Sequence, residues 1–176
     1  NKVYFVACGT AYHACLCGAQ ILERATKLPV ITQVASEFRY NDPIIDEKTL
    51  CIYVSQSGET ADTLAALRLA KSKGCTTIAI ANVLGSTISR DADYTLYTCA
   101  GPEIAVASTK AYTCQLSALY MFASHLKNYT GANVDYFADI LRVADKALKF
   151  DMKKVERIAD EIKDSTKPIF IGKDLD

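Results

Sequence analysis

The chain has 176 residues, of which 50% are hydrophobic and 23% are charged, and its 20 basic residues balance its 20 acidic ones. This is the composition of an ordinary globular domain, and it excludes a disordered chain. Nucleic acids and anionic membranes both require a basic surface on their partner. A net charge of zero therefore argues against either of them as the main partner.

The predicted secondary structure alternates between short apolar strands and longer helical patterns. The strands are near-continuously apolar and rich in β-branched residues and tyrosine, as in a parallel sheet that is covered on both faces. We expect strands at residues 3–7, 30–34, 50–54, 77–81 and 94–97, and helices at residues 11–26, 59–73 and 108–129. The alternation predicts an α/β fold with right-handed crossovers.

Two of the predicted helices carry further information. In the helix 59–73, the spacing of Ala61, Leu64, Ala65 and Leu69 predicts the face that is buried, and Gly74 is placed to end the helix in a left-handed conformation. The uncharged stretch 111–126 is shorter than the ~18–20 residues of a membrane helix. It predicts a buried core helix, although it contains Gln115 and other polar residues.

The chain divides into three predicted parts. Residues 1–130 form the α/β domain, and the charge-dense residues 131–167 form an appendage or linker of one or two amphipathic helices. The apolar run 168–171, followed by Gly172, predicts the opening strand of a second, truncated domain at residues 168–176.

The seven cysteines do not form a recognisable site. Their number is odd, most lie in apolar runs, and Cys15 and Cys17 lack the C-x-x-C spacing of a zinc or redox site. No signal-peptide pattern opens the sequence. We expect reduced and mostly buried thiols in a cytoplasmic protein.

The clearest candidate site is the segment 55–60, with the sequence Ser-Gln-Ser-Gly-Glu-Thr, between a strand and a helix. Ligands bind open parallel sheets at the carboxyl ends of strands, and a helix N-terminus attracts anions. Gly58 allows a close backbone approach, and the hydroxyl and amide groups favour a phosphate. The alternative is a simple helix cap by Ser57. Glu59 would repel a phosphate unless it points away.

Two weaker candidates follow the first and last strands. Cys8, Gly9 and Thr10 end the first strand and open a helix. The segment 103–110, which begins with Glu103 and contains Val106, leads into the long helix and places Ser108 and Thr109 at its start. Taken alone, each segment is better explained as a simple turn and cap. His13 lies too far into its helix to face the same site. The dinucleotide and P-loop motifs are missing and the two histidines are far apart, so we expect no cofactor and no metal.

Taken together, the motifs resemble a known family. Cys8–Thr10, the sequence ASEFRY at 35–40, SQSGETADTL at 55–64 and VASTKA at 106–111 occur in the order found in the first sugar isomerase (SIS) domain of the glutamine–fructose-6-phosphate aminotransferase family. The resemblance implies a three-layer α/β/α domain with a five-stranded parallel sheet. It implies that the sugar phosphate is held by Ser55, Gln56, Ser57 and Thr60, and that Thr10, the Val106 backbone and Ser108 contact the sugar. The family often has Ser where this chain has Ala11, so one hydroxyl contact is lost or made by water.

The resemblance also implies the partners. They are fructose-6-phosphate or glucosamine-6-phosphate, a second SIS domain, a glutaminase domain and a second copy of the chain in a homodimer, with no nucleic acid and no membrane. The family's catalytic glutamate, histidine and lysines belong to other segments, so this stretch is expected to bind sugar weakly and to catalyse nothing alone. The alternatives are a sugar-sensing SIS module of a regulator and a stand-alone phosphosugar isomerase, in which Lys110 would be a candidate amine.

Overall fold

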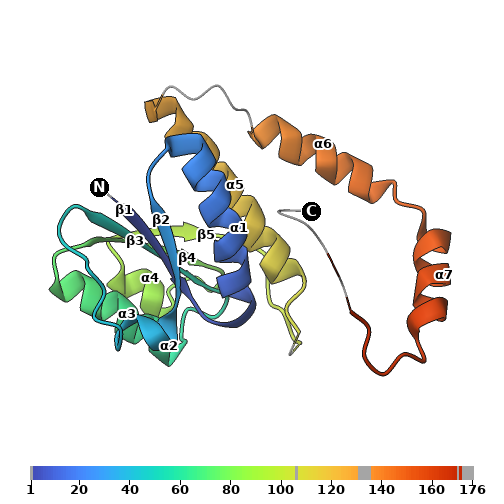
Figure 1. Ribbon diagram of the computed structural model, residues 1–176, viewed down its shortest axis with the longest axis horizontal. Helices are drawn as coiled ribbons and strands as arrows, with labels where there is room; N and C mark the ends of the chain where they lie inside the picture. Colours follow the sequence, from blue (N-terminus) through green and yellow to red (C-terminus); the bar gives the residue numbers. More distant parts are fainter. Residues whose placement is uncertain (1, 106, 131–135, 170, 172–176) are drawn as a thin grey trace. The chain divides into compact units, whose positions relative to one another are not determined.

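The structure is a computed structural model, and it describes residues 2–105, 107–130, 136–169 and 171. Five parallel strands form one sheet in the order β2-β1-β3-β4-β5 (Figure 1). The strands are β1 (Lys2–Ala7), β2 (Val30–Val34), β3 (Thr49–Ser55), β4 (Thr76–Ala81) and β5 (Tyr94–Tyr97). The predicted fold class and the five predicted strands are confirmed, to within one residue at each end.

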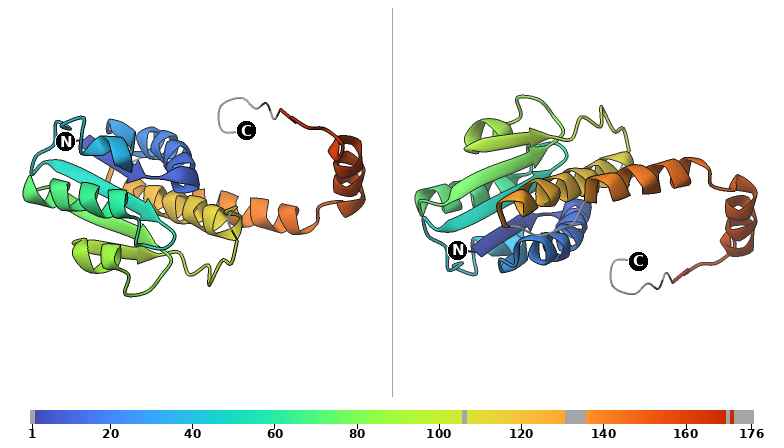
Figure 2. Two further views of the ribbon diagram at one scale, coloured as in Figure 1. Left: turned by 90° about the horizontal axis from the view of Figure 1, so that it is seen from below. Right: turned by 90° about the horizontal axis from the view of Figure 1, so that it is seen from above.

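Helices cover both faces of the sheet. The helices of residues 1–137 are α1 (Gly9–Thr26), α2 (Ala35–Phe38), α3 (Ala61–Ser72), α4 (Thr87–Asp91) and α5 (Lys110–Thr130). Figure 2 shows α1 and α5 side by side on one face and α2, α3 and α4 on the other. The short helices α2 and α4 were not predicted, because one turn of helix leaves too little periodicity to detect.

Side chains of the central strands alternate between the two layers of the core. Phe5 of β1 and Ile52 of β3 are fully buried, and Tyr53 is buried in the opposite layer with Phe38 and Leu67. Burial on both faces holds for the central strands only. Tyr94, Leu96 and Tyr97 of β5, the strand at one edge of the sheet, are exposed.

Helix α3 corrects one predicted detail and confirms another. Its buried stripe contains Ala66, Leu67 and Ala70 together with Leu64, whereas Ala61 is exposed. The helix has apolar residues on most of its surface, so its periodicity alone allowed two choices of face. As predicted, Gly74 (φ 80°) ends the helix, and its N–H and that of Cys75 close a Schellman motif on Lys71 and Ala70.

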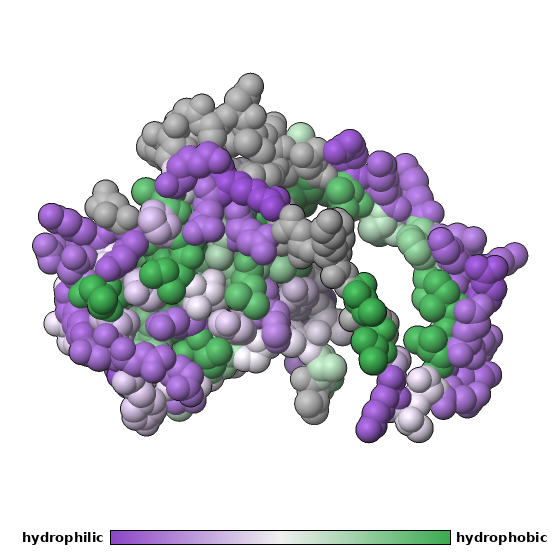
Figure 3. Space-filling view, viewed as in Figure 1, coloured by the Kyte–Doolittle hydropathy of each residue, from purple (hydrophilic) through white to green (hydrophobic). Residues whose placement is uncertain are grey.

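Residues 138–176 form a second compact unit. The predicted amphipathic helices are present as α6 (Tyr136–Leu148) and α7 (Met152–Ile162). Helix α7 has apolar residues on one side and charged residues on the other (Figure 3). The helical spacing of Val155, Ile158 and Ile162 assigns them to one face. Ile169 and Ile171 are exposed and lie outside any strand, and the rest of the strand predicted near residue 170 lies outside the described residues.

Two further expectations concern the cysteines and the membrane. All seven cysteines are free, and Cys15, Cys51 and Cys75 are buried. Cys99 is exposed and the others are half-buried, so the expected burial applies to fewer thiols than predicted. In the described part of the chain, no helix combines the length and the apolarity that crossing a bilayer takes.

Candidate functional site

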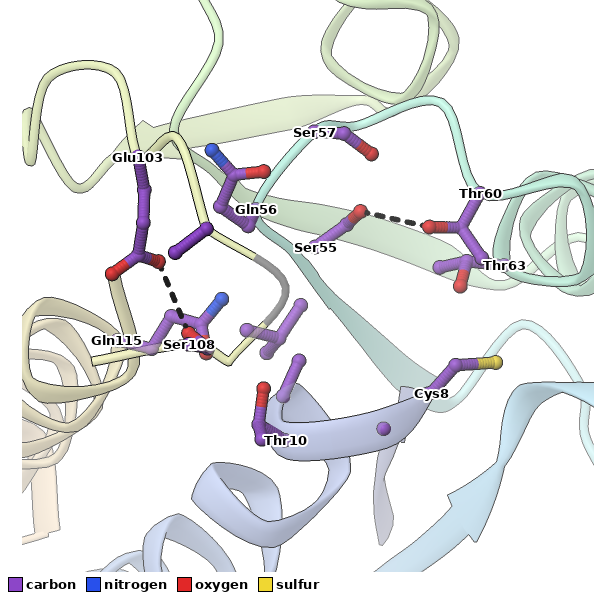
Figure 4. A pocket seen from close by; sticks show the side chains of 14 residues that line it. Cys8, Thr10, Ser55, Gln56, Ser57, Thr60, Thr63, Glu103, Ser108 and Gln115 are labelled. Atoms are coloured by element: carbon purple, nitrogen blue, oxygen red, sulfur yellow. Dashed lines mark hydrogen bonds between the residues drawn. The ribbon is translucent and has the colours of Figure 1, made fainter. Parts of the chain in front are cut away.

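A pocket of about 480 Å³ opens at the carboxyl ends of β1 and β3. These two strands are neighbours in the sheet, and the chain order reverses between them, which makes this the switch point where doubly wound sheets bind ligands. Three segments far apart in sequence line the pocket (Figure 4). The lining residues are Cys8, Gly9, Thr10, Ala11, Val54, Ser55, Gln56, Ser57, Thr60, Thr63, Glu103, Ala105, Ser108 and Gln115.

The loop between β3 and α3 holds its hydroxyl groups in a fixed arrangement. The Ser55 hydroxyl accepts a hydrogen bond from the Gly58 N–H at 3.0 Å and lies 3.4 Å from the Thr60 hydroxyl. The Glu59 N–H donates to the Ser57 hydroxyl at 3.2 Å. Thr60 is the N-cap of α3 but makes no side-chain capping bond, so its hydroxyl group remains on the pocket side. The predicted alternative, a helix cap by Ser57, is wrong in its residue, because the N-cap of α3 is Thr60 and the Ser57 hydroxyl accepts from Glu59 before the helix begins.

Gly58 shapes this loop from behind and is not among the residues that line the pocket. Its φ of +68° lies in the left-handed region, and a Cβ atom there would lie 2.2 Å from the Ser86 hydroxyl oxygen. Only glycine satisfies both the backbone conformation and this close approach. Gly58 was predicted to let a ligand approach the backbone, whereas the neighbour that it admits in the structure is Ser86.

Glu59 points away from the pocket, as a phosphate site requires. Its carboxylate accepts a 2.7 Å hydrogen bond from the Thr87 N–H at the start of α4. That N–H, with a smaller contribution from the nearby Arg90, holds the pKa of Glu59 below its ordinary value. The charge is therefore held at the beginning of a helix and not on the ligand side.

The segment after β1 forms the opposite wall of the pocket. Cys8, Gly9, Thr10 and Ala11 all line it, and Gly9 (φ 59°) makes the turn into α1. His13 is exposed and lies outside the pocket, with its ring 5.7 Å from that of Tyr12. The prediction that His13 faces elsewhere is confirmed.

The third wall comes from the segment before α5 and from α5 itself. Glu103 accepts hydrogen bonds from the Thr109 N–H and hydroxyl at 2.9 Å each and from the Ser108 hydroxyl at 3.2 Å. The Thr109 N–H is the main cause of a lowered Glu103 pKa. The hydroxyl groups of Ser108 and Thr109 thus both donate to Glu103. Val106 lies outside the described residues.

Sequence reasoning missed Thr63 and Gln115, and it named Glu103 only as the first residue of the candidate segment 103–110. Thr63 is 1% exposed and Gln115 is 3% exposed, yet the Thr63 hydroxyl and the Gln115 amide oxygen have no hydrogen-bond partner among the described residues. For Gln115 a signal existed, namely a polar residue in an otherwise apolar helical stretch. For Thr63 the sequence contained none that we can identify.

The electrostatic character of the pocket is set by neutral donors. Its described lining contains no lysine or arginine, and Glu103 is its one carboxylate. An anion there would be held by hydroxyl groups, backbone N–H groups and the start of α3, an arrangement known for phosphates. Across the described ranges, no three His, Cys, Asp or Glu side chains are grouped to bind a metal ion.

The sheet order and this polar pocket define a ligand-binding domain of the doubly wound α/β class. Residues 1–125 match the family model described as the SIS domain, and the chain belongs to this family. The resemblance predicted from the motifs is thereby confirmed.

The relatives by sequence are long enzymes. The glutamine–fructose-6-phosphate aminotransferase (isomerizing) of Clostridium tetani is 52% identical to this chain over 100% of its residues. The corresponding enzyme of Thermococcus kodakarensis is 46% identical over 99% of this chain. The chain spans about 30% of the length of each.

Solved structures give a consistent result. The C-terminal domain of glucosamine-fructose-6-phosphate aminotransferase from Francisella tularensis has a TM-score of 0.80 at 35% identity, over 93% of this chain and 48% of that one. Glucosamine-6-phosphate deaminase from Thermotoga maritima has a TM-score of 0.67 at 26% identity, over 72% of this chain and 40% of that one.

Proposed function

We propose that this chain is the first SIS domain of an isomerizing glutamine–fructose-6-phosphate aminotransferase, and that its pocket binds fructose-6-phosphate or the product glucosamine-6-phosphate. The observation that carries the proposal is the loop 55–60, whose hydroxyl groups lie at the start of α3 and at the edge of a pocket without cationic side chains. The names of the relatives, at up to 52% identity over the whole chain, support the choice of sugar.

The proposed contacts divide the pocket between the phosphate and the sugar. Ser55, Gln56, Ser57 and Thr60 hold the phosphate, because they surround the N-terminal end of α3. On the other walls, Thr10 and Ser108 contact the sugar. The backbone of Val106, which lies outside the described residues, is assigned the same role by the resemblance to the family. Ala11 lines the pocket without a hydroxyl group, so a water molecule takes the place of a direct contact there.

The domain alone is proposed to bind the sugar without converting it. Exchange of a carbonyl between neighbouring carbons needs a base with a pKa near neutrality. The one carboxylate in the described pocket lining is Glu103, and its hydrogen bonds lower its pKa, which makes it a weak base. The catalytic groups are assigned to a second SIS domain, the ammonia supply to a glutaminase domain, and the working form to a homodimer.

Calorimetric titration of the chain tests this proposal. We expect fructose-6-phosphate to bind, free fructose not to bind, and a Ser57→Ala/Thr60→Ala variant to lose at least about tenfold in affinity, as expected for two lost hydrogen bonds to a charged group. Ser72→Ala/Thr76→Ala is the matched control, because both residues are exposed and lie outside the pocket. Equal binding of fructose, or a full-affinity pocket variant, would refute the phosphate assignment.

A further inference from the structure

Gln115 occupies an unusual place on α5. The residues of the helix that are buried against the domain are Ala111, Gln115, Leu119 and Ala123, spaced four apart, and Gln115 is the one polar member of this described stripe. Its side chain is 3% exposed, as deeply buried as its apolar neighbours. A core helix that needed only packing would have an aliphatic residue at this position.

The oxygen of the Gln115 carboxamide is not used to hold the fold together. It has no hydrogen-bond partner among the described residues. A buried acceptor without a partner lowers stability, and in native proteins such groups are rare unless they serve a ligand or water. The side chain therefore has a cost in the unliganded domain that its packing does not explain.

The same side chain lines the pocket on the side opposite the phosphate loop. In Figure 4 its amide lies beside Ser108, with the nitrogen turned toward the cavity, while Ser57 and Thr60 lie across the cavity on the other wall. Ser108 already donates to Glu103, so this wall presents an amide next to a hydroxyl–carboxylate pair. The wall contains a carboxylate, whereas the residues of the loop 55–60 that line the pocket are all neutral.

The chemistry of an amide selects the kind of ligand group that it can satisfy. The oxygen needs a donor, which a phosphate dianion does not have, and the nitrogen needs an acceptor. A hydroxyl group both donates and accepts, so one hydroxyl, or two on neighbouring carbons, can pair with both ends of the amide. A half-turn of the amide exchanges its two ends without changing this requirement.

We propose that Gln115 is a specificity-determining residue that forms hydrogen bonds with hydroxyl groups on the carbons of the sugar and not with the phosphate. The inference rests on the proposed function, since it assumes that a phosphosugar enters the pocket. It assigns discrimination between sugar phosphates to α5 and general phosphate affinity to the loop 55–60.

The test is a cycle of two proteins and several ligands. Wild type and Gln115→Met are titrated with fructose-6-phosphate, with analogues that each lack one hydroxyl group, and with inorganic phosphate. We expect Gln115→Met to weaken fructose-6-phosphate by roughly 3- to 10-fold, the value of one neutral hydrogen bond, and to change inorganic phosphate by less than about twofold. For the analogue that lacks the hydroxyl group paired with Gln115, wild type and Gln115→Met should bind with the same affinity.

Thermal unfolding without ligand provides the second readout. We expect Gln115→Met to keep or raise the unfolding temperature, because it removes a buried unpaired acceptor. Leu119→Met is the matched control, because Leu119 lies on the same buried stripe but outside the pocket lining. This substitution should leave the relative affinities for all the ligands unchanged. The analogue series on wild type alone still tests the proposal if a variant does not fold.

The possible outcomes distinguish a failure of the inference about Gln115 from a failure of the proposed function. If wild type binds fructose-6-phosphate but Gln115→Met weakens all ligands equally or none, Gln115 is a packing residue and the inference is wrong. If every hydroxyl-deficient analogue binds wild type as well as fructose-6-phosphate does, it is also wrong. If wild type binds no phosphosugar, or binds it no better than inorganic phosphate, the proposed function fails first and the inference falls with it.

Discussion

The carboxylate of Glu59 accepts a 2.7 Å hydrogen bond from the backbone N–H of Thr87, and this bond joins the loop 55–60 to the start of α4. Two backbone bonds reinforce the connection. The Asn82 N–H donates to the Gln56 carbonyl at 3.3 Å, and the Ile88 N–H donates to the Gly58 carbonyl at 3.0 Å. The candidate phosphate loop is therefore held from behind by the segment that follows β4, and its geometry depends on residues that never reach the pocket.

Glu59→Ala tests this dependence. The substitution removes the acceptor for the Thr87 N–H, so α4 loses a cap and the loop loses one of its attachments. We expect a lower unfolding temperature and a several-fold loss of fructose-6-phosphate affinity by calorimetry. Glu59→Gln is the control, because its amide oxygen still accepts from Thr87 and should retain most of the affinity. If removing the carboxylate raised the affinity, Glu59 would instead act by repelling the phosphate.

Gly58→Ala separates backbone strain from steric conflict. The new methyl group would meet Ser86 at 2.2 Å in a residue with φ of +68°. Gly85 has the same φ of +68°, but nothing lies within 4 Å of its would-be Cβ, so Gly85→Ala carries the strain alone. We expect urea unfolding to show a loss of about 1 kcal/mol for Gly85→Ala and about 3 kcal/mol for Gly58→Ala. Equal losses would mean that Ser86 moves aside without cost.

The sequence contained enough to place the strands and the loop 55–60, because buried parallel strands are continuous apolar runs and turns require particular residues. It did not contain the pairing of Glu59 with Thr87, which depends on where α4 lies in space. Gln115 was read as a tolerated polar residue of a core helix. Its role depends on which side of α5 faces the open end of the sheet, and periodicity gives the buried stripe but not the cavity next to it.

Alkylation of the cysteines provides a test of pocket occupancy. Cys8 is half-buried in the pocket wall, Cys99 is exposed, and burial raises the pKa of the Cys15 thiol. Because the thiolate is the reactive form, we expect iodoacetamide to modify Cys99 and Cys8 and to leave Cys15 intact in the folded protein. Fructose-6-phosphate should slow the modification of Cys8 but not that of Cys99, as measured by peptide mass spectrometry. Equal rates at Cys8 with and without the sugar would argue against occupancy of this pocket.

The hydrogen bonds of Glu103 predict a dependence of stability on pH. The Thr109 N–H lowers the folded-state pKa of Glu103, so in the range just below the ordinary glutamate pKa of ~4.3 the unfolded chain binds more protons than the folded one. The contribution is therefore complete above that pH and is lost as the pH falls through the lowered folded-state value.

We expect urea unfolding of wild type to show a steeper loss of stability below about pH 4 than Glu103→Gln, which keeps an oxygen acceptor for Thr109 but cannot titrate. Other carboxylates also titrate in this range, so the measured quantity is the difference between the two proteins and not the slope of either. Glu47→Gln is the matched control, because Glu47 is an exposed glutamate outside the pocket lining. Parallel curves for wild type and Glu103→Gln would show that the start of α5 is held without the charge of Glu103.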